Sequence, residues 1–145
     1  MKRLTSNVSG DTLTISGLES EEIRSVRITV FVPKESLKGI AVNGAVATVR
    51  WLEPASLNII QKSGTVWITD CNIEKMEIDL QQSYLNLNTT SLDTLSANIE
   101  GSHVSINSPV AVMTGTVKNE GFLRMSDVRE IQLKKDESSN VTLHQ

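Results

Sequence analysis

An internal repeat of roughly 18–19 residues constrains this chain more than any other feature, since a period of this kind is typical of repeat folds. It runs from about position 38 to position 143. Six copies follow one another, and each carries apolar residues in the same order around an anchor position. The anchors are Lys38, Leu57, Met76, Leu95, Met113 and Ile131, which gives successive spacings of 19, 19, 19, 18 and 18. A repeat this regular determines the fold of the whole segment, because each unit packs on its neighbours.

Within each copy, apolar and polar residues alternate with a period of two. Ile78 and Leu80, for example, alternate with Glu77 and Asp79. This period is typical of a strand with one buried face, whereas a helix would place apolar residues three and four apart. In each copy the pattern predicts two short strands and a third position where an apolar side chain faces inward. These third positions form the column Ile73, Leu92, Val110 and Val128. We therefore predict an all-β fold, a single-stranded β-helix of about six rungs, right-handed by default.

Two residues break the inward pattern. Gln61 and Lys135 occupy the column that holds Leu80, Ile99 and Val117 in other copies. Burying an unpaired lysine is costly, so we expect Lys135 at an open end of the coil, or a last rung out of register. The first copy is also weaker than the middle four.

The N-terminal third lacks the repeat but contains two alternating segments, 12–15 and 26–32, the second ended by Pro33. We predict that these strands, within residues 8–33, lead into the coil and cover one end, because an uncovered strand edge invites other chains. The whole chain, 1–145, is expected to be one domain, with the β-helix repeats over 38–143.

Composition excludes several classes of function. Aromatic residues make up only 3% of the chain, so the core must be aliphatic. The net charge is -3 with both signs interspersed, which argues against a nucleic-acid partner. Apolar runs are too short to insert into a membrane. Cys71 is the only cysteine, so neither an internal disulfide nor a cysteine metal cluster is expected.

The sequence resembles a known bacterial family, the GIN domain. The resemblance rests on the segments GDTLTISG (10–17), VRITVFVP (26–33) and LKGIAVNGA (37–45), followed by strand–small turn–strand units, and it covers residues 8–143. Turns such as 43–45, 63–65 and 100–102 match the family pattern, while 81–83 and 118–120 depart from it. The resemblance implies a β-helix, export to the cell envelope and the role of an adhesin head, and it brings no catalytic residues. The alternative location is the cytoplasm.

Enzymatic chemistry has little support. Some β-helices cleave polysaccharides, which requires clustered carboxylates on one outer face. Glu77 and Asp79 point outward together, but the repeat places Asn58 and Ile60 on one side of them and Ser96 and Asn98 on the other. We expect a solvated face, no enzyme activity and no cofactor. The two histidines, His103 and His144, have no further ligands nearby, so no metal site is expected.

The candidate binding residues are aromatic: Trp51, Trp67, Tyr84 and His103. The register places His103 over Tyr84 in the column Val46, Thr65, Tyr84, His103 and Gly121. Exposed rings can stack on sugars or anchor a protein partner. The alternative is that a loop or the N-terminal strands bury Trp51 and Trp67, and this alternative is favoured. Asn88 and Asn107 share another column and are expected to form a hydrogen-bonded ladder.

Three functions remain open. The first is a non-catalytic envelope β-solenoid that binds a glycan or protein through its surface. The second is a structural β-helix that assembles through its ends into a homo-oligomer or filament, as a scaffold or in a cytoskeleton. The third is a degenerate carbohydrate-active enzyme, which would need three or more ionisable groups gathered in one crevice.

Overall fold

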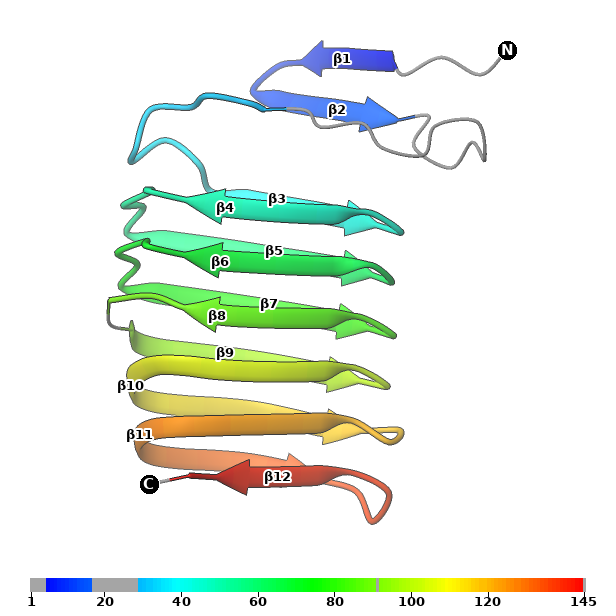
Figure 1. Ribbon diagram of the computed structural model, residues 1–145, viewed down its shortest axis with the longest axis vertical. Coiled ribbons are helices and arrows are strands. Elements are labelled where there is room, and N and C mark those ends of the chain that lie inside the picture. Colours follow the sequence, from blue (N-terminus) through cyan, green and yellow to red (C-terminus); the bar gives the residue numbers. More distant parts are fainter. Residues whose placement is uncertain (1–4, 17–28, 91, 145) are drawn as a thin grey trace. The chain divides into compact units, whose positions relative to one another are not determined.

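The computed structural model describes residues 5–16, 29–90 and 92–144, and these residues form twelve strands and no helix (Figure 1). The chain divides into two compact units, residues 1–31 and 32–145. None of the described residues forms a helix that could span a bilayer.

The described residues of the N-terminal unit form an antiparallel hairpin, β1 (Thr5–Ser9) and β2 (Thr12–Ser16). The alternating segment at 12–15 is therefore a strand, as predicted, whereas β1 was not foreseen. Its apolar residues Val8 and Leu13 lie opposite one another and are exposed. The hairpin is thus amphipathic, because the residues that alternate with them are serine, threonine and asparagine.

The prediction of a second N-terminal strand, at 26–32, is wrong for the part of this segment that the structure describes. Residues 29–32 are in no strand, and 26–28 lie outside the described part of the chain. Alternation produces a strand only where a partner takes up the backbone hydrogen bonds, and Val30 and Phe31 are both exposed. That the N-terminal strands cover an end of the coil stays a prediction.

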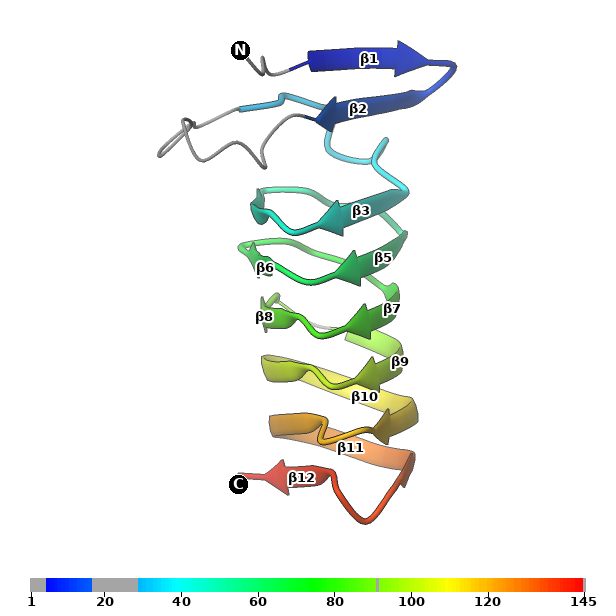
Figure 2. The same cartoon turned by 90° about the vertical axis from the view of Figure 1, so that its right-hand side faces the viewer.

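Residues 39–143 form the predicted β-solenoid, built from two walls of stacked parallel segments (Figures 1 and 2). The first wall contains β3 (Gly39–Asn43), β5 (Ser56–Lys62), β7 (Lys75–Gln81), β9 (Leu92–Glu100), and the second halves of β10 (His103–Lys118) and β11 (Phe122–Lys135). The second wall contains β4 (Val46–Arg50), β6 (Thr65–Thr69), β8 (Tyr84–Asn88), residues 103–106 of β10, 122–125 of β11, and β12 (Asn140–Leu143).

Each wall thus holds six stacked segments, which correspond to about five full turns. In Figure 1 the rear strands run to the right and the front strands to the left as the chain descends, so the coil is right-handed. The number of stacked segments and the right-handed sense of the coil both agree with the sequence prediction. In the later rungs β10 and β11 pass through the corner between the walls without a break.

The repeat register is confirmed for the anchor column. Leu57 pairs with Met76, Met76 with Leu95, Leu95 with Met113, and Met113 with Ile131. The spacing between successive anchors in the sequence is therefore the true length of each turn. Each rung hydrogen-bonds only to the rungs above and below it, so stability accumulates from neighbour contacts.

The core is aliphatic, as composition required. Burying such a side chain fully contributes about 1.5–3 kcal/mol before entropy is counted. The third inward column is buried where the coil is complete: Ile73, Leu92 and Val110 are at most 2% exposed. The largest fully buried side chains are Leu57, Ile59, Ile68, Ile73, Met76, Leu80, Leu85, Leu87, Leu92, Leu95, Ile99 and Ile106.

The two breaks in the inward pattern have different explanations. Gln61 is fully buried, and its amide Nε2 donates to the carbonyl oxygens of Gly64 at 2.9 Å and Tyr84 at 3.1 Å. Lys135 stays in register opposite Val117 but belongs to the last segment of the first wall, where it is exposed. The open-end explanation for Lys135 is therefore confirmed, and the out-of-register explanation is wrong.

The corners are held by buried hydroxyls. At one corner, the Ser102 Oγ accepts from the backbone N–H of Ser83 at 3.0 Å. At another, the Ser108 Oγ accepts from the backbone N–H of Thr89 at 2.6 Å. The expected ladder is wrong, because no side-chain hydrogen bond joins Asn88 to Asn107, although both residues are described; the buried bonds at this corner join Thr89 to Ser108 instead.

Candidate binding site

Four aromatic rings run along the outer face of the second wall. Trp67 contacts Tyr84 with ring centroids 6.0 Å apart and a tilt of 46°. Tyr84 stacks on His103 at 5.4 Å, and His103 stacks on Phe122 at 4.4 Å. The parallel register produces this stack, because it places Tyr84, His103 and Phe122 at the same position of successive rungs. The predicted neighbours Trp67, Tyr84 and His103 are thus brought together.

Phe122 was not predicted to belong to this column, where the repeat pattern placed Gly121. The register shows His103 opposite Phe122, while Gly121 is buried in the preceding turn. The error arose because Phe122 and Leu123 are both apolar and either one fits an inward position. Leu123 is fully buried and Phe122 is half-buried, so the aliphatic side chain takes the core and the ring lies outside.

Both tryptophans are exposed, so the expectation that they are buried is wrong. Trp67 is 39% exposed and Trp51 is 67% exposed. Trp51 directly follows β4 in a turn and has a backbone φ of 60°, a conformation that bulky residues rarely adopt. It makes no ring contact with the other aromatic residues that the structure describes. The structure therefore does not join Trp51 to the stack.

The stacking decides which ring faces a ligand can reach. The His103 ring is covered on both faces, by Tyr84 and by Phe122, with interplanar angles of 21° and 26°. A sugar packs on a ring face, so these inner rings offer only their edges. Trp67 and Phe122 are the two ends of the stack, and each contacts one aromatic neighbour only among the described residues. Phe122 is half-buried, whereas Trp67 is exposed. Trp67 is consequently the best-placed ring for a ligand.

Polar side chains continue the row that starts at Trp67. Asn86 lies opposite Trp67, Ser105 opposite Asn86, and Arg124 opposite Ser105. Three rung spacings of about 4.8 Å make this row about 14 Å long. An amide, a hydroxyl and a guanidinium can each bond to oxygen-rich groups of a ligand that lies along the coil.

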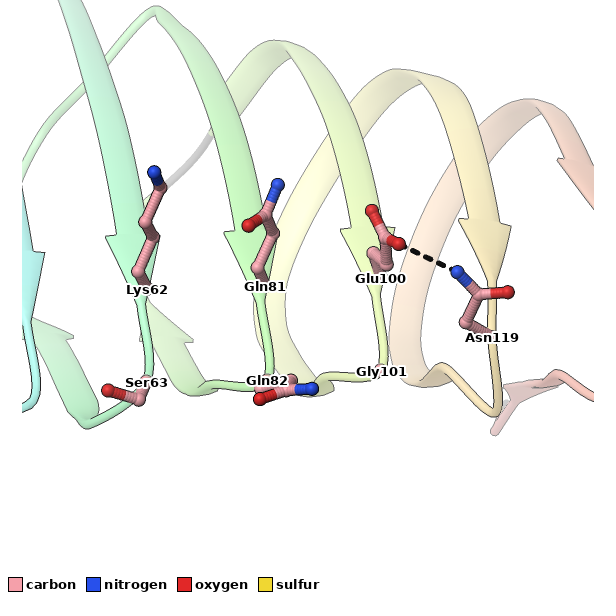
Figure 3. Close-up of a pocket in the computed structure, with 7 residues that line it drawn as sticks. All are labelled: Lys62, Ser63, Gln81, Gln82, Glu100, Gly101 and Asn119. Carbon is pink, nitrogen blue, oxygen red and sulfur yellow. Dashed lines mark hydrogen bonds between the residues drawn. The ribbon is translucent and has the colours of Figure 1, made fainter.

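Two shallow grooves lie elsewhere on the coil. One, of about 420 Å³, follows the corner that ends the first wall, where Lys62, Gln81 and Glu100 point to the same side (Figure 3). Glu100 is already bonded there to the Asn119 Nδ2 at 2.7 Å and lies 3.7 Å from the Lys118 Nζ. The remaining polar groups of this groove do not converge on one point.

The second groove, of about 430 Å³, lies on the outer face of the first wall and contains Glu77 and Asp79. The register places Asn58 and Ser96 beside Glu77, and Ile60 and Asn98 beside Asp79, as predicted. These two carboxylates are the only ionisable side chains among the residues that line it.

Cysteine and metal chemistry add no further site among the described residues. Cys71 is buried, and that burial raises the pKa of its thiol above the usual range, so little reactive thiolate forms. No group of three or more His, Cys, Asp or Glu side chains in the described part of the chain is arranged to hold a metal ion.

Comparison with known proteins gives no further assignment: no protein-family model, curated protein or solved structure matches this chain.

Proposed function

We propose that this chain is a non-catalytic binding domain of the bacterial cell envelope, of the adhesin-head type that its resemblance to GIN domains implies. Its second wall binds a glycan or protein, and the ligand packs on Trp67. The β-helix acts by display, because a rigid coil holds outward side chains in fixed rows. The envelope location rests on the family resemblance alone.

The observation that carries this proposal is the exposed ring of Trp67 at the end of the aromatic stack. Aromatic rings are scarce in this chain, yet four of them lie together on one outer face. A tryptophan left 39% exposed has not been used to fill the core, which is complete without it. Exposed tryptophans of this kind provide much of the binding energy at recognition sites.

The arrangement of ionisable groups supports a binding role over catalysis. Each of the two grooves described above is lined by two ionisable side chains, Lys62 and Glu100 in one, Glu77 and Asp79 in the other. A glycosidase needs an acid and a carboxylate base or nucleophile that face each other across a bond. Glu77 and Asp79 instead stand side by side on one strand of an open wall.

A glycan-array screen tests the proposal. We expect the purified chain to bind a defined set of glycans, and Trp67→Ala to weaken this binding about tenfold, since a ring contact contributes about 1–2 kcal/mol. Ile60→Ala is the matched control, because Ile60 is 47% exposed on the opposite wall. It should bind like the unmodified chain.

A protein ligand is tested on the same surface by capture from bacterial or host cell extracts, compared between Trp67→Ala and Ile60→Ala. Equal binding by the two variants, for every ligand found, would contradict the proposed site.

A further inference from the structure

The second wall differs from the first in charge. Its six strand segments, 46–50, 65–69, 84–88, 103–106, 122–125 and 140–143, all described, contain no aspartate or glutamate. A stretch of their combined length would hold about three acids at the frequency of the whole chain, 17 in 145. The first wall has longer strand segments and contains six acids, at about the frequency of the whole chain: Glu77, Asp79, Asp93, Glu100, Asp127 and Glu130. Strand propensity alone therefore does not explain the absence of acids, because both walls are strands.

The same face carries two arginines. Arg124 lies three rungs from Trp67 in the same row, and Arg50 lies opposite Thr69, two residues beyond Trp67 on the same strand. Both are exposed. The ion pairs in the described part of the chain join Lys34 to Glu53 and Lys118 to Glu100, so neither arginine is neutralised by a carboxylate of the described coil.

The polar side chains that lie between Trp67 and Arg124 in this row are also available to bond to a ligand. Neither Asn86 nor Ser105 uses its side chain in a hydrogen bond to another described residue, and both are half-buried. The row thus offers, in order, a ring face, an amide, a hydroxyl and a guanidinium. Guanidinium groups bind carboxylates and sulfates through two parallel hydrogen bonds, while amides and hydroxyls pair with sugar hydroxyls.

We infer that the ligand of the second wall is an acidic glycan, which lies along the coil with a sugar ring on Trp67 and a carboxylate or sulfate on Arg124. This inference rests on the proposed function and adds the chemical class of its ligand. An acidic peptide would satisfy the arginines, but it leaves the ring face and the amide and hydroxyl row without a specific role.

Matched pairs of acidic and neutral glycans test the inference: oligogalacturonates and their methyl esters, sialylated and plain lactose, sulfated and unsulfated lactosamine. We expect at least one acidic member to bind tenfold or more tightly than its neutral partner, with an affinity that falls as sodium chloride rises. Arg124→Gln should remove this preference and leave the melting temperature unchanged. Lys134→Gln, which removes an exposed charge from the first wall, should keep it.

The outcomes separate the two claims. Equal binding of acidic and neutral partners, still lost in Trp67→Ala, would overturn the acidic class and leave the binding site standing. Tighter binding of oligoglutamate than of every acidic glycan, dependent on Arg124, would replace the glycan by an acidic peptide. Absence of Trp67-dependent binding to any glycan or protein would overturn the proposed function itself.

Discussion

Asp136 holds together the last turn between the walls. One of its carboxylate oxygens accepts from the backbone N–H of Asn119 at 2.7 Å, and the other accepts from the hydroxyls of Ser138 at 2.9 Å and Ser139 at 2.7 Å. Asn119 has a φ of 53°, in the left-handed region that asparagine adopts more readily than most other residues with a side chain. The hydroxyl of Ser139 and the N–H of Asn119 lower the pKa of Asp136 from 3.8 to about 2.

This pKa predicts a pH-dependent contribution to stability. A lowered folded-state pKa stabilises the fold above pH 3.8, and the stabilisation is lost as the pH falls toward about 2. We expect Asp136→Asn to lower the melting temperature at pH 7, with a difference from the unmodified chain that shrinks below pH 3.8. Thermal unfolding followed by circular dichroism measures it, with the adjacent exposed Glu137→Gln as control. A difference that is constant from pH 7 to pH 2 would contradict the assigned cause.

At the scale of elements, the repeat was predictable and its exceptions were not. The strands and their register follow from sequence because identical columns, such as Leu85 and Val104, must stack to be buried. The direction of Phe122 was ambiguous, because two adjacent apolar residues fit the same period. A strand was wrongly predicted at 29–32, because the alternation of apolar and polar residues does not reveal whether a partner strand is present.

The candidate site could be predicted only in part, because the repeat period gives the direction of a side chain but not its exposure. Outward positions follow from the period, so the neighbourhood of Trp67, Tyr84 and His103 came from register alone. The exposure of Trp67 and Trp51 depends on where the rest of the chain packs, which no local pattern reports. The absence of acids on the second wall was visible in the sequence only once its residues were known to share one face.

Gly115 shows how closely the rungs approach in the first wall. A Cβ added there would lie 1.7 Å from the carbonyl oxygen of Ala97, and its φ is 138°. We expect Gly115→Ala to destabilise the chain by about 3 kcal/mol or more, because the backbone has to shift. Gly101→Ala should cost only about 1 kcal/mol, since its added Cβ would meet ordinary contacts beyond 3.4 Å. Urea unfolding compares the two, and equal losses would contradict the close approach.

At the scale of the whole solenoid, the last first-wall segment, residues 127–135 of β11, pairs with β10 only among the described residues and carries a charged residue in the inward column. Ile131 and Leu133 continue the apolar columns there, but Lys135 takes the place of Val117 one rung earlier. Its Nζ donates to the carbonyl oxygen of Ser139 at 3.4 Å. An inward charge at an edge strand discourages pairing with another chain, which weighs against assembly through this end.

Replacing that charge should promote association. We expect Lys135→Leu to complete an apolar end and to shift the chain toward dimers or larger species as concentration rises. Light scattering coupled to size-exclusion chromatography measures the mass. Lys134→Leu, which alters the outward face of the same strand, should associate less. Identical masses for all three proteins across the concentration range would show that Lys135 does not control this edge.

Fluorescence of Trp67 tests the central claim most directly, because Trp51→Phe leaves it as the only tryptophan in the chain. Titration of this variant with the glycans bound on the array should quench or blue-shift the Trp67 emission. The change should saturate at the concentration where binding saturates by calorimetry. Saturable binding without any change in Trp67 emission would place the ligand elsewhere and contradict a binding site on the second wall.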